Sequence, residues 1–135
     1  MTESGPTGHT LIDDFDPQAF AERWAADWNV LDVEQVAAHF AEDCSFISPL
    51  AATLTGSATL QGRVQLAAYW RIALQHVRSL HFALDRLAWD AERRTLVVFY
   101  VARTNGQAKR AAEAWTFDAS GQVQHGEALY GAALT

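Results

Sequence analysis

The chain has 135 residues, half of them hydrophobic, and its 16 acidic and 10 basic side chains give a formal net charge of −6. This composition excludes a disordered chain, and the lack of a Lys/Arg cluster argues against a nucleic-acid partner. Cys44 is the only cysteine, so no internal disulfide can form, and no apolar run approaches the ~18 residues of a membrane span. The N-terminus lacks the basic start and apolar core of a signal peptide. We therefore expect a cytoplasmic protein that binds neither nucleic acid nor membrane.

The length is typical of one domain. Residues 1–14 contain Gly, Pro, Thr and Ser without periodicity and are predicted to form a flexible arm, which leaves residues 15–135 as a single domain. Asp16 followed by Pro17 is typical of a helix start, with the acid as N-cap and the proline in the first turn. This helix has an apolar stripe at three- and four-residue spacing, formed by Phe20, Ala21, Trp24, Ala25 and Trp28.

The next segment is predicted to contain two further helices and one strand. Asp32 can cap a short helix whose apolar residues repeat at helical spacing, namely Val33, Val36, Ala37 and Phe40. Residues 44–48 are predicted to form a strand that ends at Pro49, because proline cannot donate to a β-ladder. Residues 50–62 are predicted to form a loop, and residues 63–77 a helix with Leu66, Trp70, Ala73 and Val77 on one face.

From residue 80 onward the apolar pattern changes from the helical period to the strand period of two. Residues 80–89 and 95–103 are predicted to be strands, and Asn105-Gly106 is a strong signal for a tight turn into the next strand. The order is thus helix, helix, strand, helix and then four strands in a meander. It predicts an α+β domain with its helices on one face of a curved antiparallel sheet.

The last two strands are predicted to form a β-hairpin from Arg110 to Gly131, joined by the turn residues Asp118 to Gly121. In its first strand Ala111, Glu113, Trp115 and Phe117 share one face, so Glu113 lies among apolar side chains. In its second strand Val123, His125, Glu127 and Leu129 are expected to share one face, which adds a second acid, Glu127. The role of both carboxylates depends on which face of the hairpin meets the interior.

Three local patterns, together with the order of elements, resemble the nuclear transport factor 2-like superfamily, in particular its SnoaL-like and ketosteroid-isomerase-like members. Residues 40–49, FAEDCSFISP, are similar to the segment of the family that runs into its first strand. The loop 56–62, and residues 115–123 followed by 128–131, look like the loop before the family's third helix and its last two strands. The resemblance covers nearly the whole chain after the arm. The resemblance specifies the fold more closely than the function, because this fold hosts isomerases, dehydratases, cyclases, hydrolases and non-catalytic subunits.

The resemblance implies a cone, in which a bent antiparallel sheet surrounds an apolar pocket and three helices of the N-terminal half pack on its concave side. Members of the family often form dimers through the outer sheet face, so a homodimer is expected. In such a cone Glu113, Trp115 and Phe117 face the cavity. Poor solvation there should raise the pKa of the Glu113 carboxyl group.

Ketosteroid isomerase uses an Asp as base, while a Tyr and a protonated Asp hold the enolate oxygen. By local pattern, Glu113 matches the protonated acid, Ser48 stands at the position of the base, and Trp24 stands at that of the tyrosine. A serine hydroxyl is a very poor proton acceptor at neutral pH, and an indole N–H donates a single hydrogen bond from a bulkier ring. Steroid isomerisation by that mechanism is therefore not expected, whereas other general acid/base chemistry stays open.

The sequence thus predicts a pocket for a small, largely apolar or carbonyl-containing ligand, with Glu113, Glu127 and Ser48 as candidate catalytic residues. The side chains expected to line the pocket are Trp24, Phe46, Trp70, Tyr100, Trp115 and Leu129. No cofactor is expected, and no metal, because the histidines and acids lack ligand spacing such as HxxxH or HxH.

The alternative is a non-catalytic ligand-binding or protein-interaction module of the same fold. In that case Glu113 would only form a structural ion pair with an arginine, for which Arg63, Arg103 and Arg110 are the candidates. His39 and His81 are further acid/base candidates because imidazole titrates near neutrality. Cys44 has no basic neighbour in the sequence and is expected to be a small buried hydrophobe.

Overall fold

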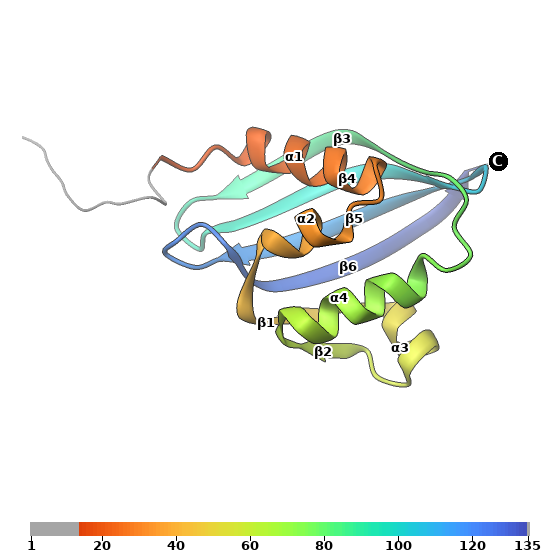
Figure 1. Ribbon diagram of the computed structural model, residues 1–135. Coiled ribbons are helices and arrows are strands. Elements are labelled where there is room, and N and C mark those ends of the chain that lie inside the picture. The colour runs from red at the N-terminus through yellow and green to blue at the C-terminus, as the bar shows by residue number, and fades with distance from the viewer. Residues whose placement is uncertain (1–13, 135) are drawn as a thin grey trace, which may run out of the picture.

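A computed structural model describes residues 14–134 (Figure 1). The predicted arm, apart from Asp14, lies outside the described residues. The helices are α1 (Pro17–Asn29), α2 (Val33–Ala38), α3 (Pro49–Thr55) and α4 (Gly62–Ala73). The strands are β1 (Phe40–Ile47), β2 (Thr59–Gln61), β3 (Leu80–Asp90), β4 (Thr95–Thr104), β5 (Gln107–Phe117) and β6 (Val123–Leu134). No helix in this part of the chain is long and apolar enough to cross a membrane.

The strands form one curved, open sheet in the order β2-β1-β6-β5-β4-β3, and α1, α2 and α4 lie over one of its faces (Figure 1). The predicted α+β architecture with helices on the concave side of a curved sheet is confirmed. The expectation of a wholly antiparallel sheet is wrong at one place, because β1 pairs with β6 in parallel. These two strands are far apart in the sequence, so no hairpin dictates an antiparallel pairing between them.

The predicted start and stripe of α1 are confirmed. The Asp16 carboxylate accepts a hydrogen bond from the Ala19 backbone N–H at 3.1 Å, and Pro17 occupies the first turn. The apolar stripe is buried against the sheet. At the other end of the helix, the Asn29 side chain donates to the Phe82 carbonyl (3.3 Å) and accepts from the Phe82 N–H (2.7 Å). This pair of bonds ties α1 to the edge strand β3.

The predicted loop 50–62 contains the short helix α3 and the strand β2. Ser48 and Pro49 explain the difference, because the serine hydroxyl caps the first turn of α3 and the proline fits that turn. Gly56 then ends the helix with a φ of 86°, a left-handed conformation that glycine adopts without strain. Helix α4 ends at Ala73, four residues before the predicted end at Val77.

Along β4 and β5 the inner face of the sheet changes from larger core side chains to positions that include alanine. At one end Leu96 pairs with Trp115 and Val98 with Glu113, and the large side chains there pack into the core against α1. Toward the hairpin 104–107 the inner positions of β4 and β5 include the small residues Ala102 and Ala111, and in β6 the small Ala128 lies opposite Glu113. Large side chains therefore fill one end of the cone, whereas small ones leave space at the other.

A β-bulge in β6 inverts its faces. Phe117 pairs with Val123 but Thr116 pairs with His125, so Gln124 is an extra residue in β6. Past this residue the inner positions are Gly126, Ala128 and Tyr130, whereas His125, Glu127 and Leu129 point to the outer face. The prediction that Val123 shares a face with these last three residues is wrong, because one inserted residue flips the side chains that follow it, here as far as Tyr130, after which the register shifts again.

Candidate functional site

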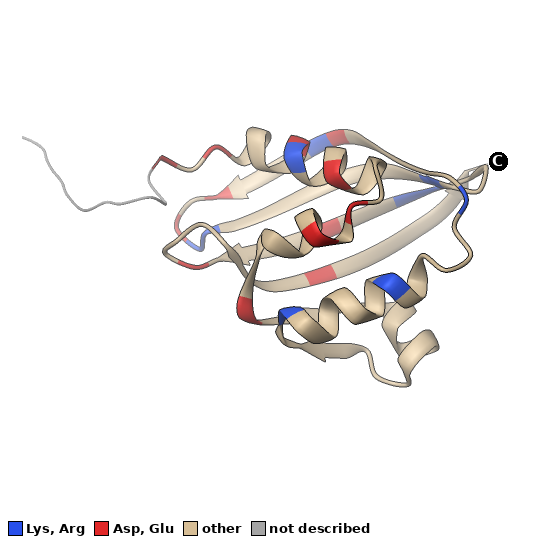
Figure 2. Ribbon diagram, viewed as in Figure 1, with Lys and Arg blue, Asp and Glu red and all other residues tan. Residues whose placement is uncertain are grey.

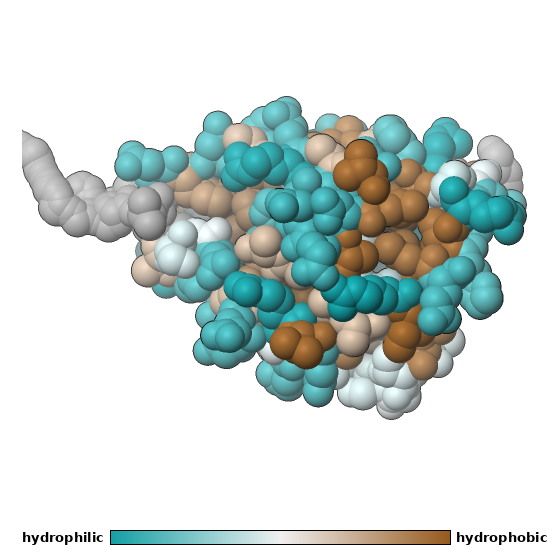
Figure 3. Space-filling view, viewed as in Figure 1, coloured by the Kyte–Doolittle hydropathy of each residue, from teal (hydrophilic) through white to brown (hydrophobic). Residues whose placement is uncertain are grey.

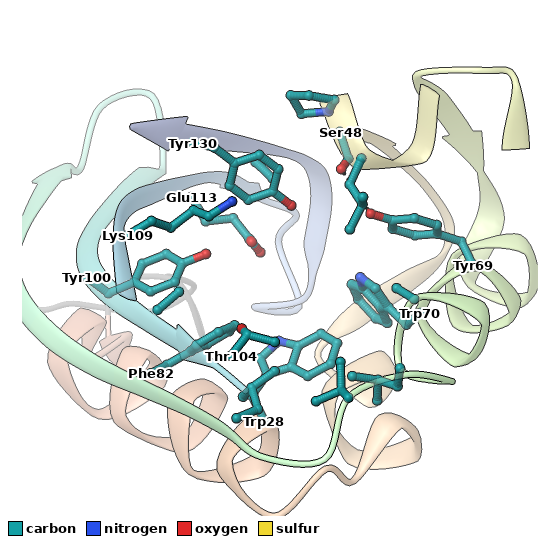
Figure 4. A pocket seen from close by; sticks show the side chains of 18 of the residues that line it. Trp28, Ser48, Tyr69, Trp70, Phe82, Tyr100, Thr104, Lys109, Glu113 and Tyr130 are labelled. Atoms are coloured by element: carbon teal, nitrogen blue, oxygen red, sulfur yellow. Dashed lines mark hydrogen bonds between the residues drawn. The ribbon is translucent and has the colours of Figure 1, made fainter. Parts of the chain in front are cut away.

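A cavity of about 540 Å³ lies between the concave face of the sheet and α1, α3 and α4 (Figure 4). Its walls are mainly aromatic, formed by Trp28, Phe46, Tyr69, Trp70, Phe82, Tyr100 and Tyr130. Figure 3 shows hydrophobic residues gathered around a hollow between the end of α1 and α4. This size and apolar lining are typical of a site for a small molecule.

Glu113 provides the buried carboxyl group of this cavity. Its side chain comes from β5, is only 6% exposed and points into the cavity (Figure 4). Trp115, two residues further along the same face, donates a hydrogen bond from Nε1 to Glu113 Oε2 at 2.8 Å. No hydrogen bond from residues 14–134 engages the other carboxyl oxygen, which leaves it available to a ligand.

A structural ion pair does not account for Glu113. Among the described residues, no arginine or lysine lies within salt-bridge distance of its carboxyl group. Arg110 instead contacts Asp85 at 2.8 Å, and Arg63 donates to the Phe40 carbonyl at 3.0 Å. The predicted alternative of a pair with Arg63, Arg103 or Arg110 is therefore absent from this part of the chain.

Burial is the main cause of the raised pKa of the Glu113 carboxyl group. Removal from water raises the pKa of the carboxyl group to about 8, and the hydrogen bond from Trp115 opposes this rise only in part. The group is therefore mostly protonated at neutral pH. A protonated carboxyl group can donate a hydrogen bond to a ligand, and the carboxylate form becomes accessible just above neutrality.

Two tyrosines lie beside Glu113 at the next inner position of the neighbouring strands. Tyr100 and Tyr130 both pair with Ala111, and their hydroxyl groups point into the cavity (Figure 4). Burial, followed by the nearby Glu113 charge, raises the pKa of Tyr100 well above its ordinary value. This hydroxyl therefore stays protonated at physiological pH and can act as a hydrogen-bond donor.

Ser48 also lines the cavity, but its hydroxyl already has structural partners. Its side chain is fully buried, and Oγ lies 3.0 Å from the Tyr69 hydroxyl oxygen. Oγ also accepts a long hydrogen bond of 3.4 Å from the Ala51 N–H at the start of α3. Ser48 thus connects β1, α3 and α4, and its side-chain hydrogen bonds within the described chain include no base that could activate it.

The structure brings together five of the nine predicted site residues on the cavity wall, namely Glu113, Ser48, Phe46, Trp70 and Tyr100. Trp115 lies behind the wall, fully buried, and donates a hydrogen bond to Glu113, which lines the cavity. Trp24 is also fully buried behind the wall, packed edge-on against Trp115 and Tyr100, and its Nε1 has no hydrogen-bond partner among the described residues.

Glu127 and Leu129 lie on the outer face of the sheet, away from the cavity. The bulge at Gln124 is the reason, since it turns both side chains outward and replaces them on the inner face by Ala128 and Tyr130. The prediction that Glu127 and Leu129 lie in the pocket is therefore wrong.

The sequence interpretation missed Tyr130 and Lys109 on the cavity wall. Lys109 precedes Glu113 by four residues in an alternating strand, so its inner position could have been found by counting. Tyr130 could not be placed in this way, because the count passes through the bulge. The one available signal was Gly126, since glycine within a strand often marks a bulge or a close approach.

The remaining candidates lie outside the cavity. His39 pairs with Asp27 through Nε2 at 2.8 Å, and His81 is exposed on β3. Cys44 is fully buried, as predicted, and burial raises the pKa of its thiol. No cluster of metal-binding side chains occurs among residues 14–134.

The family model for a SnoaL-like domain matches residues 21–125. The chain belongs to the SnoaL-like family. This confirms the resemblance drawn from the three sequence patterns. No curated protein matches the sequence of this SnoaL-like chain.

Solved structures agree with this assignment. A SnoaL-like protein of unknown function from Burkholderia thailandensis has 28% sequence identity and a TM-score of 0.74, covering 86% of this chain and 95% of that chain. An NTF2-like protein of unknown function from Burkholderia pseudomallei has 19% identity and a TM-score of 0.72, with coverages of 85% and 90%. TerC, co-crystallised with polyporic acid, has 15% identity and a TM-score of 0.71, with coverages of 86% and 92%. The last two likenesses show a common fold alone.

Proposed function

We propose that this SnoaL-like protein binds a small, largely apolar carbonyl compound in the cavity and that Glu113 acts on it by general acid/base chemistry. The observation that carries the proposal is a buried carboxyl group that faces an aromatic cavity and whose only hydrogen-bond partner among the described residues is Trp115. Perturbed carboxyl groups in apolar clefts are enriched at functional sites. The crystallisation of one fold neighbour with polyporic acid supports a small-molecule ligand.

The chemistry follows from the groups around Glu113. With a pKa of about 8, both forms of the carboxyl group are present near neutrality. The carboxylate form removes a proton from the carbon beside a carbonyl group, and the resulting enolate oxygen accepts hydrogen bonds from the Tyr100 and Tyr130 hydroxyls. Glu113 then returns the proton to carbon. Such proton transfer is the common step of isomerases, cyclases and dehydratases that act beside a carbonyl group.

A second candidate function is binding of the same type of ligand without catalysis. Ser48 favours it, because the position that the ketosteroid-isomerase-like resemblance assigns to the base holds a hydroxyl engaged with Tyr69 and α3. Glu113 would then only donate a hydrogen bond to the ligand. The expected homodimer through the outer sheet face and the cytoplasmic location stay predictions under both functions.

Deuterium exchange of an enolisable ketone separates the two candidates. We expect the wild-type protein to bind 2-tetralone and to accelerate exchange of its α-protons in D₂O by at least about 100-fold, a typical contribution of a positioned base. Glu113→Gln keeps the hydrogen-bonding shape but cannot carry a proton, so exchange should fall to the uncatalysed rate while binding persists. NMR follows the exchange, and tryptophan fluorescence follows binding.

The matched control is Glu127→Gln, which makes the same change on the outer face of the same hairpin. It should exchange 2-tetralone at the wild-type rate. Binding without exchange in the wild-type protein would establish the non-catalytic candidate. Absence of binding would contradict the proposal of a pocket for carbonyl compounds.

A further inference from the structure

Lys109 is the cationic side chain that lines the cavity. The other ionisable groups on its wall are Glu113 and tyrosines. No carboxylate lies within salt-bridge distance of Lys109 in the part of the chain that the structure describes. The adjacent residue, Arg110, points to the other face of β5 and is paired with Asp85. The chain carries a net negative charge, so the unpaired ammonium group of Lys109 gives the cavity a charge opposite in sign to that of the protein as a whole.

Lys109 and Glu113 lie at two separate points along the cavity wall, and the path between them is open. Both residues occupy the inner face of β5, four positions apart, which corresponds to roughly 13 Å between their Cα atoms. The inner position between them is Ala111, whose methyl group leaves the path open. Figure 4 shows both side chains on the same cavity wall, with Tyr100 and Tyr130 on either side.

The Tyr130 ring holds the ammonium group of Lys109 beside the cavity. Nζ lies 5.2 Å from the ring centroid, within the distance of a cation–π contact. Next to Lys109, toward the turn of the β4–β5 hairpin, Thr104 and Gln107 complete a polar rim around the cavity. Figure 2 shows further basic segments at this end of the sheet. The cavity is therefore apolar along its walls, carries a carboxyl group on its floor and has a cation at its rim.

This arrangement selects a ligand by charge. Near neutrality Glu113 is mostly uncharged, so Lys109 carries the formal charge of the cavity wall. A cationic ligand would be repelled by the ammonium group, whereas an anionic end group would gain a charge-assisted hydrogen bond there. The aromatic walls at the same time require an apolar body.

We propose that Lys109 anchors an anionic group and that the ligand is an aromatic or alicyclic carboxylate whose opposite end places a carbonyl group beside Glu113 and the two tyrosines, Tyr100 and Tyr130. This inference rests on the proposed function, since it assigns the second end of the ligand that the cavity binds. It makes Lys109 a residue that determines specificity through direct contact with the ligand.

A pair of matched probes tests the proposal. 6-Acetyl-2-naphthoate and 2-acetylnaphthalene share the same ring system and methyl ketone, and differ only in the carboxylate. We expect calorimetric titration at pH 7 and low salt to give the wild-type protein about tenfold higher affinity for the carboxylate. Lys109→Met should remove this preference, so that the two probes bind with similar affinity, whereas Lys109→Arg should keep the preference.

Arg110→Met is the control, because it removes the same charge from the next residue of β5 on the outer face. It should retain the preference. Equal affinities in the wild-type protein, or a preference that survives Lys109→Met, would overturn the anchor while leaving the proposed pocket intact. If neither probe binds, the pocket proposal and the anchor fall together. An added salt series should shrink the preference, since screening weakens an exposed ionic contact.

Discussion

Replacing Glu113 by Gln is expected to stabilise the protein at pH 8 by about 4 kcal/mol relative to the wild type, or on the order of 10 °C in the unfolding midpoint. The reason is the cost of a buried carboxyl group whose pKa rises from 4.5 to about 8 on folding. Glutamine has the same shape, can still accept the hydrogen bond from Trp115, and has no proton to lose. Glu113→Gln is therefore expected to make the protein more stable while it removes the residue proposed to carry the function.

The pH dependence of this difference follows from the direction of the shift. Below pH 4.5 the folded and unfolded states are both protonated, so Glu113 imposes no pH-dependent cost. Between pH 4.5 and about 8 only the unfolded state loses its proton, so wild-type stability falls by about 1.4 kcal/mol per pH unit relative to Glu113→Gln. Above pH 8 both states are ionised and the difference levels off.

Chemical unfolding of both variants between pH 4 and pH 9 measures this difference, and other titrating groups cancel because the two variants share them. Glu127→Gln, on the exposed outer face, should follow the wild-type curve. A difference between Glu113→Gln and the wild type that does not change with pH would mean that Glu113 keeps an ordinary pKa in the folded protein.

Replacing Gly126 by Ala is expected to cost about 2 kcal/mol of stability and to distort the cavity wall. A Cβ atom at this position would lie 2.7 and 2.9 Å from two ring carbons of Phe46 and 3.3 Å from Cδ1 of Trp115. Both rings are buried and packed, so neither can move aside freely. Because Phe46 lines the cavity and Trp115 holds Glu113, the same change should weaken ligand binding.

A double-mutant cycle tests whether the Phe46 ring causes the loss of stability in Gly126→Ala. In a Phe46→Leu background the ring is absent, so Gly126→Ala should cost at least about 1 kcal/mol less than in the wild type, measured by urea unfolding. Equal costs in the two backgrounds would show that the ring does not limit the size of residue 126.

The sequence predicted the fold well because its signals are local and agree with one another. Asp16 and Pro17 mark the start of α1, the apolar stripe gives its buried face, and the change to a period of two marks the sheet. The inner position of Glu113 followed from the alternation of β5, since this strand has no inserted residue. The resemblance to the SnoaL-like family then indicated that this face of β5 points into the cavity.

The parts that the sequence did not predict depend on contacts between distant segments. The bulge at Gln124 arises in the pairing of β6 with β5, and apart from Gly126 no local pattern indicated that Glu127 and Leu129 would turn outward. Ser48 and Pro49 suggested the end of a strand, although the same two residues also begin a helix. Which of these two structures forms is decided by packing, to which the bond between Ser48 and Tyr69 contributes.

The function proposed for the cavity depends on the protonation of Glu113, and a direct titration of its carboxyl group tests it. In protein labelled with ¹³C at the glutamate carboxyl carbon, the resonance missing from the Glu113→Gln spectrum belongs to this residue. We predict that this resonance titrates with a midpoint of about pH 8. A midpoint near the ordinary value of 4.5 would contradict the account, because Glu113 would then be a solvated carboxylate and not a buried acid of the cavity.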